Sequence, residues 1–375
     1  MVWNWEHPDW PDFQWDSAAL AEMEARFLHS SGMQIGSLKH FDDDTRLSIM
    51  VDTLTGEALK TSEIEGEILN RDSVQSSILN GFGLPTDGRR VAPAERGIAD
   101  MMIDLHRHFD QPVTHATLNG WHRMITNGRT DLKDIGQYRT HEQPMQVVSG
   151  ALHKPNVHFE APPSAAMPGE MDRFIDWLAA TAPGGERALP PLTRAGLAHL
   201  YFVCIHPFED GNGRIARALA EKMLAQGIGQ PTLLALSHTI QRHRKRYYDT
   251  LEANNKDIEV TDWLVYFAST VLDAQRYTQR LIDFLIEKTK IYDRVRGQIN
   301  ERQERVLARL FKEGPDGFKG GLSAGNYITI TGAARATATR DLNHLVELNV
   351  LSVRGTLKST RYWLNITGED NNIPS

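Results

Sequence analysis

The side chains most suited to chemistry fall within the run HPFEDGNGRIAR, which begins at His206. His206 is the group in this run that can accept a proton near neutral pH. Asp210 can hold a hard divalent cation, because Mg²⁺ takes one or two carboxylates together with substrate phosphates. Asn212 can donate to a phosphoryl oxygen, and Arg214 and Arg217 are three residues apart, so they share a helix face. A base, a metal ligand and phosphate clamps together predict transfer of a phosphorus-containing group.

Two apolar, helix-like runs flank these residues, at 192–205 and 215–226. Pro207 disfavours helical geometry in the residue before it, so the first helix is predicted to end there. Gly211 and Gly213 are expected to allow tight backbone angles, with the second helix beginning at about residue 213 or 214. The loop amides and the second helix N-terminus then converge on one small volume, which attracts phosphate.

The run is similar to the signature of the Fic family, His-Pro-Phe-x-(Asp/Glu)-Gly-Asn-Gly-Arg-x-x-Arg, and no position departs from it. The related Doc-type kinases carry Ala and Lys at the positions of Gly211 and Gly213, which argues against that branch. The resemblance extends over about Asp42 to Arg296, densely at two motifs and loosely elsewhere. It implies an all-α bundle with a short β-hairpin called the flap.

The same resemblance implies protein AMPylation, in which AMP passes from ATP to a Ser, Thr or Tyr hydroxyl of a target protein. His206 would take the hydroxyl proton as the oxygen attacks the α-phosphorus, and Asp210 would hold Mg²⁺. Arg217 would hold the γ-phosphate. The remaining nucleotide contacts would come from the loop residues Gly211, Asn212, Gly213 and Arg214.

A second motif, TSEIEGE, begins at Thr61 near the end of a helix predicted over 42–70. By charge alone it would be a solvated helix face. Beside the signature it resembles the Fic inhibitory motif, (Ser/Thr)-x-x-x-Glu-(Gly/Asn), with Thr61, Glu65 and Gly66 at its fixed positions. The resemblance implies that Glu65 pairs with Arg217 and occupies the γ-phosphate site, since a carboxylate imitates phosphate for a guanidinium. Gly66 is expected to let the helix approach closely.

Two further segments are candidate nucleotide contacts. A β-branched run at 145–150 and a second extended piece at 156–159 predict a hairpin, which is either an ordinary surface hairpin or the flap that aligns a target by strand pairing. The resemblance makes its backbone, at Val148, Ser149 and Gly150, a neighbour of the nucleotide. The basic stretch 241–248 reads by itself as a solvated helix face. The residues that match the family's adenine and ribose pocket are Tyr247, Tyr248 and Asn255.

The other segments are predicted from hydrophobic periodicity and from residues that begin or end helices. Trp3, Trp5, Trp10 and Trp15 predict an apolar N-terminal clasp, with a peptide- or base-stacking platform as the alternative. Gly32 and Gly36 are expected to flank a turn. Helices are predicted at 17–30, 42–70, 94–109, 114–125, 168–180 and, as one long helix or two, 262–296, with a loop at 85–93 and the pair Trp121-His122 in the core.

Composition sets the broad class. The chain has 375 residues, a formal net charge of −7 and one cysteine, which excludes an intramolecular disulfide and suits the cytoplasm. No apolar run approaches the length of a membrane span, and no secretory signal is recognisable. Cys204 is two residues from His206, on a different side of a helix, so the two are not a nucleophile–base pair and Cys204 is expected in the core.

The C-terminal part differs from the rest of the chain in its predicted elements and in its charge. Helices are predicted at 298–311 and 331–349 and a β-hairpin at 350–363 around Gly355, an order that resembles a winged helix. Between Glu301 and Arg361 ten Lys or Arg oppose six acids, which gives +4. Such a domain binds DNA through its second helix, or serves in docking or dimerisation. A polar, disordered tail follows residue 367.

The sequence therefore predicts an autoinhibited protein adenylyltransferase. Its domains are a tryptophan-rich extension (1–41), an inhibitory helix region (42–93), a Fic core (94–296), a winged helix (297–367) and a tail (368–375). The expected partners are ATP with Mg²⁺, a target protein, the chain itself as a target, and DNA or a second copy through the winged helix. Two rival hypotheses are a hydrolase that removes AMP from a target, with Glu65 positioning water, and a DNA-binding regulator with a nucleotide-sensing core.

Overall fold

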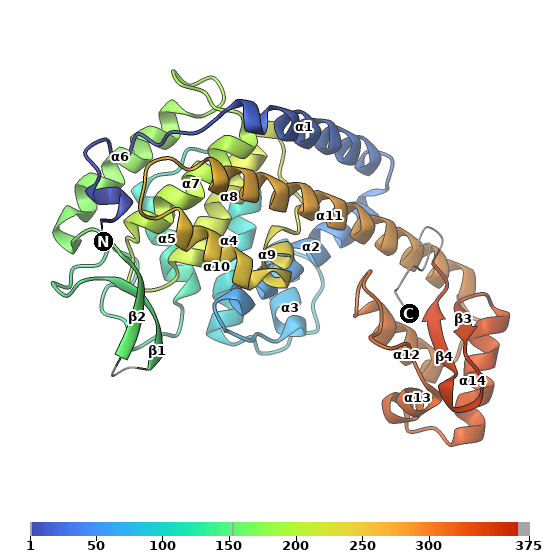
Figure 1. The fold of residues 1–375 in the computed structure, drawn as a ribbon. Helices are drawn as coiled ribbons and strands as arrows, with labels where there is room; N and C mark the ends of the chain where they lie inside the picture. The colour runs from blue at the N-terminus through green and yellow to red at the C-terminus, as the bar shows by residue number, and fades with distance from the viewer. Residues whose placement is uncertain (1, 152–153, 367–375) are drawn as a thin grey trace. The chain divides into compact units, whose positions relative to one another are not determined.

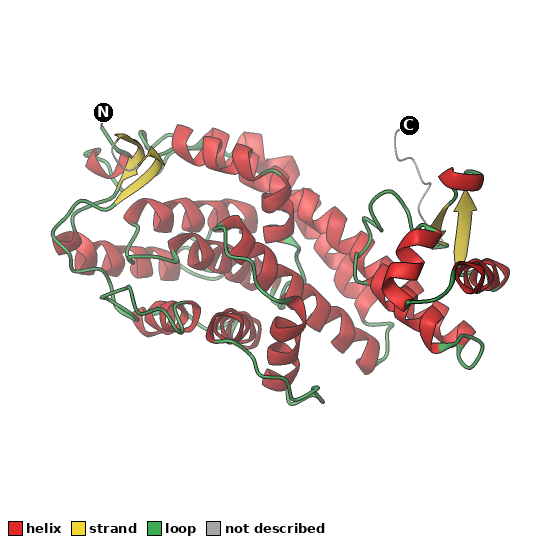
Figure 2. Ribbon diagram, turned by 90° about the horizontal axis from the view of Figure 1, so that it is seen from below, coloured by secondary structure: helices red, strands yellow, loops and turns green. Residues whose placement is uncertain are grey.

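The computed structural model describes residues 2–151 and 154–366. The chain forms two compact units, Met1–Tyr277 and Thr278–Ser375, each described here by itself. Both are mostly helical, and each contains one small antiparallel hairpin (Figures 1 and 2). The all-α prediction is confirmed, and the predicted tail at 368–375 lies outside the described residues.

The first unit is built around two helices, α7 (Pro191–Ile205) and α8 (Asn212–Ile228), which pack along each other at its centre (Figure 1). Helix α7 is apolar on all sides and almost wholly buried, as a central helix must be. The predictions for both helices and for the break between them are confirmed. The helices around this pair are α4 (Pro93–Arg107), α5 (His115–Ile125), α6 (Met167–Ala180), α9 (Leu236–Arg242), α10 (Arg244–Ala253) and the long α11 (Thr261–Val295).

Several core predictions from the sequence hold. Trp121 and His122 are buried, and the imidazole of His122 stacks on the ring of Phe208 with centroids 4.2 Å apart. Cys204 is also buried, and burial raises the pKa of its thiol to about 12, so it is an inert core residue. The loop predicted at 85–93 is confirmed up to the start of α4.

The tryptophan-rich N-terminal segment lies over the hairpin of the first unit. Trp3 packs edge-on against Phe159, with ring centroids 5.3 Å apart, and the Trp5 indole donates to the carbonyl oxygen of Glu160 at 2.6 Å. Both partners belong to strand β2 (Lys154–Glu160). The segment is therefore the apolar clasp that the sequence predicts.

Helix α1 runs over Ala18–Leu38 and passes through Gly32 and Gly36 without a break. The turn expected at these glycines is wrong. A glycine inside a helix costs only about 1 kcal/mol relative to alanine, so a helix that is otherwise well packed continues through it. Gln275 holds α1 on both sides of Gly32: its side chain donates to the buried Ser31 hydroxyl at 2.8 Å, and its carbonyl accepts from the Gln34 side chain at 2.9 Å.

Helix α2 covers Asp43–Ile64, so the single helix predicted over 42–70 is too long. It ends because Gly66 adopts a left-handed conformation, with φ +87°, which glycine accepts without steric cost. The next helix, α3 (Arg71–Gly81), begins after Asn70, whose side chain accepts from the Ser73 amide. A Cβ on Gly66 would meet nothing within 4 Å. Gly66 therefore ends the helix, and the close approach expected of it is wrong.

Two glycines of this region give a matched prediction for stability. Gly66→Ala is expected to lower the free energy of unfolding by about 1 kcal/mol, because alanine is strained at a positive φ. Gly56→Ala is the control: Gly56 lies inside α2 with open space around it, so alanine is expected to raise stability by about 0.5–1 kcal/mol. Denaturant unfolding of the two variants measures both. Equal effects of the same sign would contradict the assignment of Gly66 as the helix terminator.

The predicted hairpin forms from β1 (Gln146–Ala151) and β2, paired antiparallel, with a bulge-like register shift between Val147 and Val148. Phe159, near the base of the hairpin, is buried, whereas Val148 is 49% exposed. The hairpin is thus anchored at one end and open along β1.

The second unit contains α12 (Glu301–Phe311), α13 (Ala324–Thr331), α14 (Arg335–Glu347) and a hairpin of β3 (Leu351–Arg354) and β4 (Arg361–Leu364). The helix predicted over 331–349 is wrong in its first residues, because Gly332, with φ +72°, ends α13. The hairpin around Gly355 is confirmed. Asp341 joins the three helices by accepting from Arg302 and from the Tyr327 hydroxyl. The assignment of this unit as a winged helix stays a prediction.

Among the described residues, every helix is too short or too polar to span a bilayer.

Candidate active site

His206 directly follows α7 and adopts a left-handed conformation, with φ +53° and ψ +56°. Pro207 explains why the helix stops, since a residue before proline avoids helical geometry. The His206 amide still donates to the Phe202 carbonyl, and its Nδ1–H donates to the Val203 carbonyl at 3.2 Å. The ring is therefore held at Nδ1, and Nε2 keeps a free lone pair.

Arg139 holds the backbone of His206 in this conformation. Its guanidinium is buried and donates to the backbone carbonyls of His206, at 2.8 Å, and Pro162, at 2.5 Å. Its amide donates to the Pro207 carbonyl at 2.9 Å. Burial lowers the pKa of Arg139 to about 10. The sequence did not single it out, because a contact across 67 residues leaves no local pattern.

His206 is suited to accept a proton. Burial lowers the pKa of its imidazole to about 4, so the ring is neutral at pH 7. A neutral ring with Nδ1–H engaged presents Nε2 as the base. The geometry agrees with the role predicted for His206.

The loop between the helices is shaped by Gly211 and Asn212. Gly211 has φ +81°, a left-handed conformation that needs glycine. Asn212 begins α8, one or two residues earlier than predicted. Its side chain accepts from the Phe208 amide at 3.0 Å and donates to the Phe208 carbonyl at 2.8 Å. Asn212 therefore clamps the loop with the side-chain amide that was expected to donate to phosphate.

Gly213 has helical geometry, so its predicted role in a tight turn is wrong. What it supplies is room. A Cβ built on Gly213 would lie 2.3 Å from Oε1 of Glu65 and 3.2 Å from a terminal nitrogen of Arg217. The Glu65 carboxylate thus rests against the first turn of α8, where the helix dipole and unpaired amides favour an anion.

Arg217 receives that carboxylate. The two groups form an ion pair of 2.8 Å, with Arg217 buried and Glu65 partly exposed. Arg217 also donates to the Thr61 hydroxyl and to the Thr61 carbonyl, each at 2.8 Å. Burial acts to lower the pKa of Arg217, yet the Glu65 charge holds it above its usual value. The predicted pair of Glu65 and Arg217 is present, and Thr61 completes it.

Arg214 has a carboxylate of its own. It pairs with Glu67 at 2.9 Å and lies 3.7 Å from Asp210. The sequence reading missed Glu67, because it placed residues 65–67 inside a regular helix. Because of the left-handed turn at Gly66, the acidic side chains on either side of it both reach the signature arginines. Glu65 pairs with Arg217, and Glu67 pairs with Arg214.

Asp210 is the candidate metal ligand. Its side chain is 39% exposed, pairs with Arg129 at 2.6 Å and accepts from the Gly211 amide at 2.6 Å. Burial acts to raise its pKa, but Arg214 and Arg129 hold it below the usual value. Nowhere in the described ranges do three His, Cys, Asp or Glu side chains gather around one point. A single accessible carboxylate fits Mg²⁺ that takes its remaining ligands from phosphates and water.

The predicted adenine contacts divide into two groups. Tyr248 is 36% exposed, and its hydroxyl lies 3.3 Å from Oε2 of Glu65. Tyr247 is buried, with its hydroxyl 3.0 Å from Nε2 of His199, so its ring is not open for stacking. Asn255 is also buried: its amide donates to the His158 carbonyl at 3.0 Å, and its Oδ1 has no partner among the described residues.

The candidate flap residues lie on the open part of the hairpin. Val148 and Ser149 are exposed, and Gly150 has φ +90°. The Ser149 hydroxyl lies 2.6 Å from the imidazole of His158 on β2. That contact places a polar group, and not only backbone, on this face of the flap.

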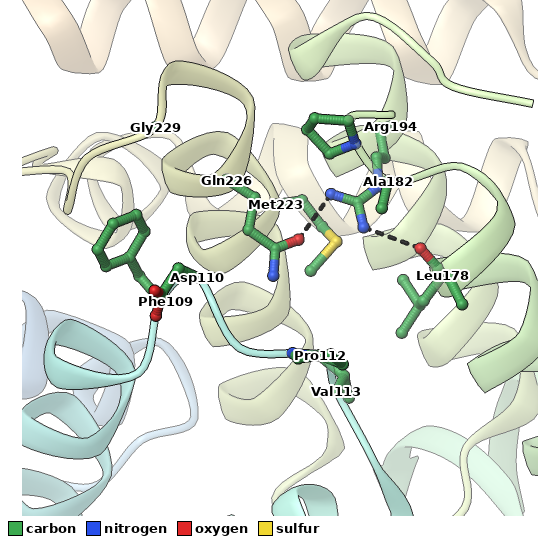
Figure 3. A pocket seen from close by; sticks show the side chains of 12 residues that line it. Phe109, Asp110, Pro112, Val113, Leu178, Ala182, Arg194, Met223, Gln226 and Gly229 are labelled. Atoms are coloured by element: carbon green, nitrogen blue, oxygen red, sulfur yellow. Dashed lines mark hydrogen bonds between the residues drawn. The ribbon is translucent and has the colours of Figure 1, made fainter. Parts of the chain in front are cut away.

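A cavity of about 450 Å³ lies at the opposite end of α8, away from the signature loop (Figure 3). Arg194 faces it, donating to Gln226 at 2.8 Å and to the Leu178 carbonyl at 2.9 Å, and Met223 and Val113 contribute apolar lining. The guanidinium of Arg194 joins α6, α7 and α8, and burial lowers the pKa of Arg194 to about 10. This cavity holds none of the candidate site residues.

Comparisons with known proteins agree with this geometry. Residues 112–224 match the model of the Fic/DOC family, and residues 3–84 match a domain of unknown function, DUF4172. The chain is 35% identical over 124 residues to a protein adenylyltransferase Fic of Nematostella vectensis, and 38% identical over 89 residues to that of Culex quinquefasciatus. These matches cover 33% and 24% of this chain, but only 25% and 16% of the two relatives.

Solved structures show the same fold. A Fic family protein from Desulfovibrio desulfuricans G20 matches over 94% of this chain and 98% of its own, with a TM-score of 0.54 and 20% identity. A Fic domain containing signaling protein from Bacteroides thetaiotaomicron matches over 69% of this chain and 96% of its own, with a TM-score of 0.50 and 18% identity. The predicted resemblance is confirmed: residues 112–224, which contain the signature loop near their C-terminal end, form a domain of the Fic/DOC family.

Proposed function

We propose that the protein is an adenylyltransferase that moves AMP from ATP to a hydroxyl of a target protein. One observation carries the proposal: a neutral histidine base and two buried arginines converge at the N-terminus of α8, and carboxylates occupy the anion positions. The names of the relatives from Nematostella vectensis and Culex quinquefasciatus support the same reaction.

In this mechanism each group has one task. His206 Nε2 takes the proton of the attacking hydroxyl while the oxygen bonds to the α-phosphorus and pyrophosphate leaves. Arg214 and the amides of the first turn of α8 stabilise the charge that develops on the phosphoryl oxygens. Arg217 holds the terminal phosphate. Asp210 would hold Mg²⁺, which when bound would neutralise phosphate charge.

We further propose that the segment directly after α2 inhibits the enzyme through two carboxylates. Glu65 blocks the Arg217 position, and Glu67 neutralises Arg214. The ion pair of Glu65 with Arg217 is harder for nucleotide to displace than that of Glu67 with Arg214. Arg217 is nearly inaccessible to solvent and also donates two hydrogen bonds to Thr61. The Glu67 side chain is 39% exposed, so solvent screens its pair and nucleotide displaces it more readily.

Labelled ATP tests the reaction class. With the full chain, label from the α position should remain on protein after denaturation, and label from the γ position should not. Transfer from the γ position would indicate a kinase. Loss of AMP from a previously modified target, with no transfer, would favour the hydrolase hypothesis. Protein that is unlabelled from either position, even with Glu65 replaced, would contradict the proposal.

The pH dependence of the reaction follows from the His206 pKa. The base must be neutral, so kcat/KM is lost as pH falls through the pKa of the free enzyme. With a pKa near 4, about 90% of His206 is still neutral at pH 5, whereas a pKa of 6.5 would leave about 3%. We expect kcat/KM of the Glu65→Gly variant to stay nearly constant from pH 7 to 5. A fall of tenfold or more over this range would contradict the low pKa.

A further inference from the structure

The cavity of about 450 Å³ at the far end of α8 contains a buried positive charge (Figure 3). The Arg194 side chain lines it from α7, and the residue is only 3% exposed. Among the described residues of the lining, the other charged one is Asp110, which is exposed and so lies at the rim. Neither the family signature nor the proposed mechanism uses this cavity.

Arg194 has no counter-charge in the part of the chain that the structure describes. Its guanidinium donates to three neutral oxygens instead: the Thr181 hydroxyl at 3.4 Å, the Gln226 side chain at 2.8 Å and the Leu178 carbonyl at 2.9 Å. Burial lowers the pKa of Arg194 to about 10, and within residues 2–151 and 154–366 no acid raises it again. The group is still protonated at pH 7, so a positive charge is held here without an anion.

The hydrogen bonds of Arg194 explain only part of its presence. They hold α6, α7 and α8 together, but this task does not require a charge, because all three acceptors are neutral. Each terminal nitrogen makes one of these bonds, so each keeps a second N–H without a partner among the described residues. A buried charge with unused donors is costly unless an anion completes it. Arg194 is therefore suited to bind an anionic ligand.

The remaining walls of the cavity are mostly apolar. Val113, Leu178 and Met223 are buried, and Phe109 and Pro112 add further apolar surface. Met223 has a flexible, polarisable side chain that adapts to different shapes. The volume falls in the range of about 300–1,000 Å³ that is typical of small-molecule sites, which combine apolar walls with a few polar groups. A ligand would thus bury an apolar body here and present its charge to Arg194.

The charges of the lining narrow the class of ligand. A guanidinium pairs with a carboxylate through two N–H groups, one for each oxygen. A phosphate group would bring more charge and more oxygens, and the described lining has no second cation for them. Asp110 would also repel a second negative charge. We propose that this cavity binds a small monocarboxylate with an apolar body, such as a medium-chain fatty acid, through Arg194.

The first experiment uses octanoate as the probe and methionine methyl groups as the readout. The full chain is labelled with ¹³C-methyl methionine, and the Met223 signal is assigned with Met223→Leu. Octanoate should shift the Met223 signal until it saturates, and it should leave the signal of Met33, an exposed residue of α1, unchanged. A Met223 signal that does not move at millimolar octanoate overturns the proposal.

Two further probes test the class of ligand. Octanol has the same apolar chain without the charge, so it should bind about tenfold more weakly or worse, because a hydrogen bond to a charged group is lost. Inorganic phosphate should leave the Met223 signal unchanged. Octanol that binds as tightly as octanoate would show a purely apolar cavity, and a shift with phosphate would show another class of anion. Either result overturns the assignment to a monocarboxylate.

A cavity-filling variant tests the location. Ala182→Leu places a larger side chain in the cavity and leaves the hydrogen bonds of Arg194 in place, so it should remove the octanoate-induced shift of Met223. Ala165→Leu is the matched control, because it makes the same change at an exposed alanine outside the lining. Octanoate binding that is unchanged in Ala182→Leu overturns the proposal.

Replacing Arg194 tests the role of its charge. Arg194→Gln should make octanoate and octanol bind equally, whereas Arg194→Lys, which keeps the charge but not the planar fork, should retain part of the preference. Thermal unfolding shows whether each variant is folded, and the Ala182→Leu result decides if Arg194→Gln is not. A folded Arg194→Gln chain that still prefers octanoate contradicts the assigned role. No step requires nucleotide, so failure here leaves the proposed function standing.

Discussion

Replacing Glu65 by glycine is expected to raise AMP transfer, self-modification included, by about tenfold or more. The Glu65 carboxylate is paired with Arg217 at 2.8 Å, so Arg217 cannot hold the terminal phosphate while the pair is made. A tenfold gain needs only about 1.4 kcal/mol of relief, which is within the range of one charged hydrogen bond. Incorporation of α-label into protein under saturating Mg-ATP measures the gain.

Glu63→Gly is the matched control. Glu63 lies in the same helix turn but pairs with Lys60, so this change adds the same backbone freedom and leaves the Arg217 pair intact. Arg217→Ala should stay inactive, because it frees Glu65 but removes the phosphate clamp. The double variant should resemble Arg217→Ala. If Glu65→Gly and Glu63→Gly behave alike, the inhibitory role of Glu65 is wrong.

Glu67→Gln extends this prediction. Its pair with Arg214 is more exposed, so the single variant should raise transfer less than Glu65→Gly does. Combined with Glu65→Gly, it should lower the KM for ATP further.

His206→Ala is expected to lower transfer about 10²–10⁴-fold, the usual loss when a positioned base is removed. ATP binding should persist, because the base acts on the hydroxyl and not on the nucleotide. The loss is best measured in the Glu65→Gly chain, where the starting rate is high, with nucleotide affinity determined separately by calorimetry.

The backbone of His206 calls for a second variant. Alanine is strained at φ +53°, whereas asparagine tolerates this region and cannot act as a base. His206→Asn should therefore be as inactive as His206→Ala but better folded. His141→Ala, which removes a half-buried histidine whose Nδ1 contacts the nearby Gln143 carbonyl, is the control. Transfer near the parent rate in His206→Asn would rule out His206 as the base.

Local features of the site were predictable from sequence, because they depend on neighbours in the chain. Pro207 ends α7, Gly211 adopts a positive φ, and Asp210, Arg214 and Arg217 follow at helical spacing. The motif at Thr61 was placed correctly against Arg217 through family resemblance. Both are cases in which a short pattern carries the structural information.

The rest of the site comes from contacts that no local pattern encodes. Arg139 reaches His206 across 67 residues, and Arg129 reaches Asp210 across 81. Glu67 was missed because the end of α2 was placed too late, and periodicity locates helix ends poorly. Gly213 was assigned to a turn, although its role is to leave space for a carboxylate from another helix.

The space above Gly213 has a thermodynamic consequence. In the proposed function this space takes either the Glu65 carboxylate, which fills it in the structure, or a phosphate of the nucleotide, so docking of the segment after α2 and binding of that phosphate compete. A bound protein or a modification that favours undocked α2 must raise the affinity for nucleotide. Because linkage is reciprocal, nucleotide must raise the affinity for such a bound protein by the same ratio. A partner that activates the enzyme through α2 can therefore be sought by its tighter binding in the presence of ATP.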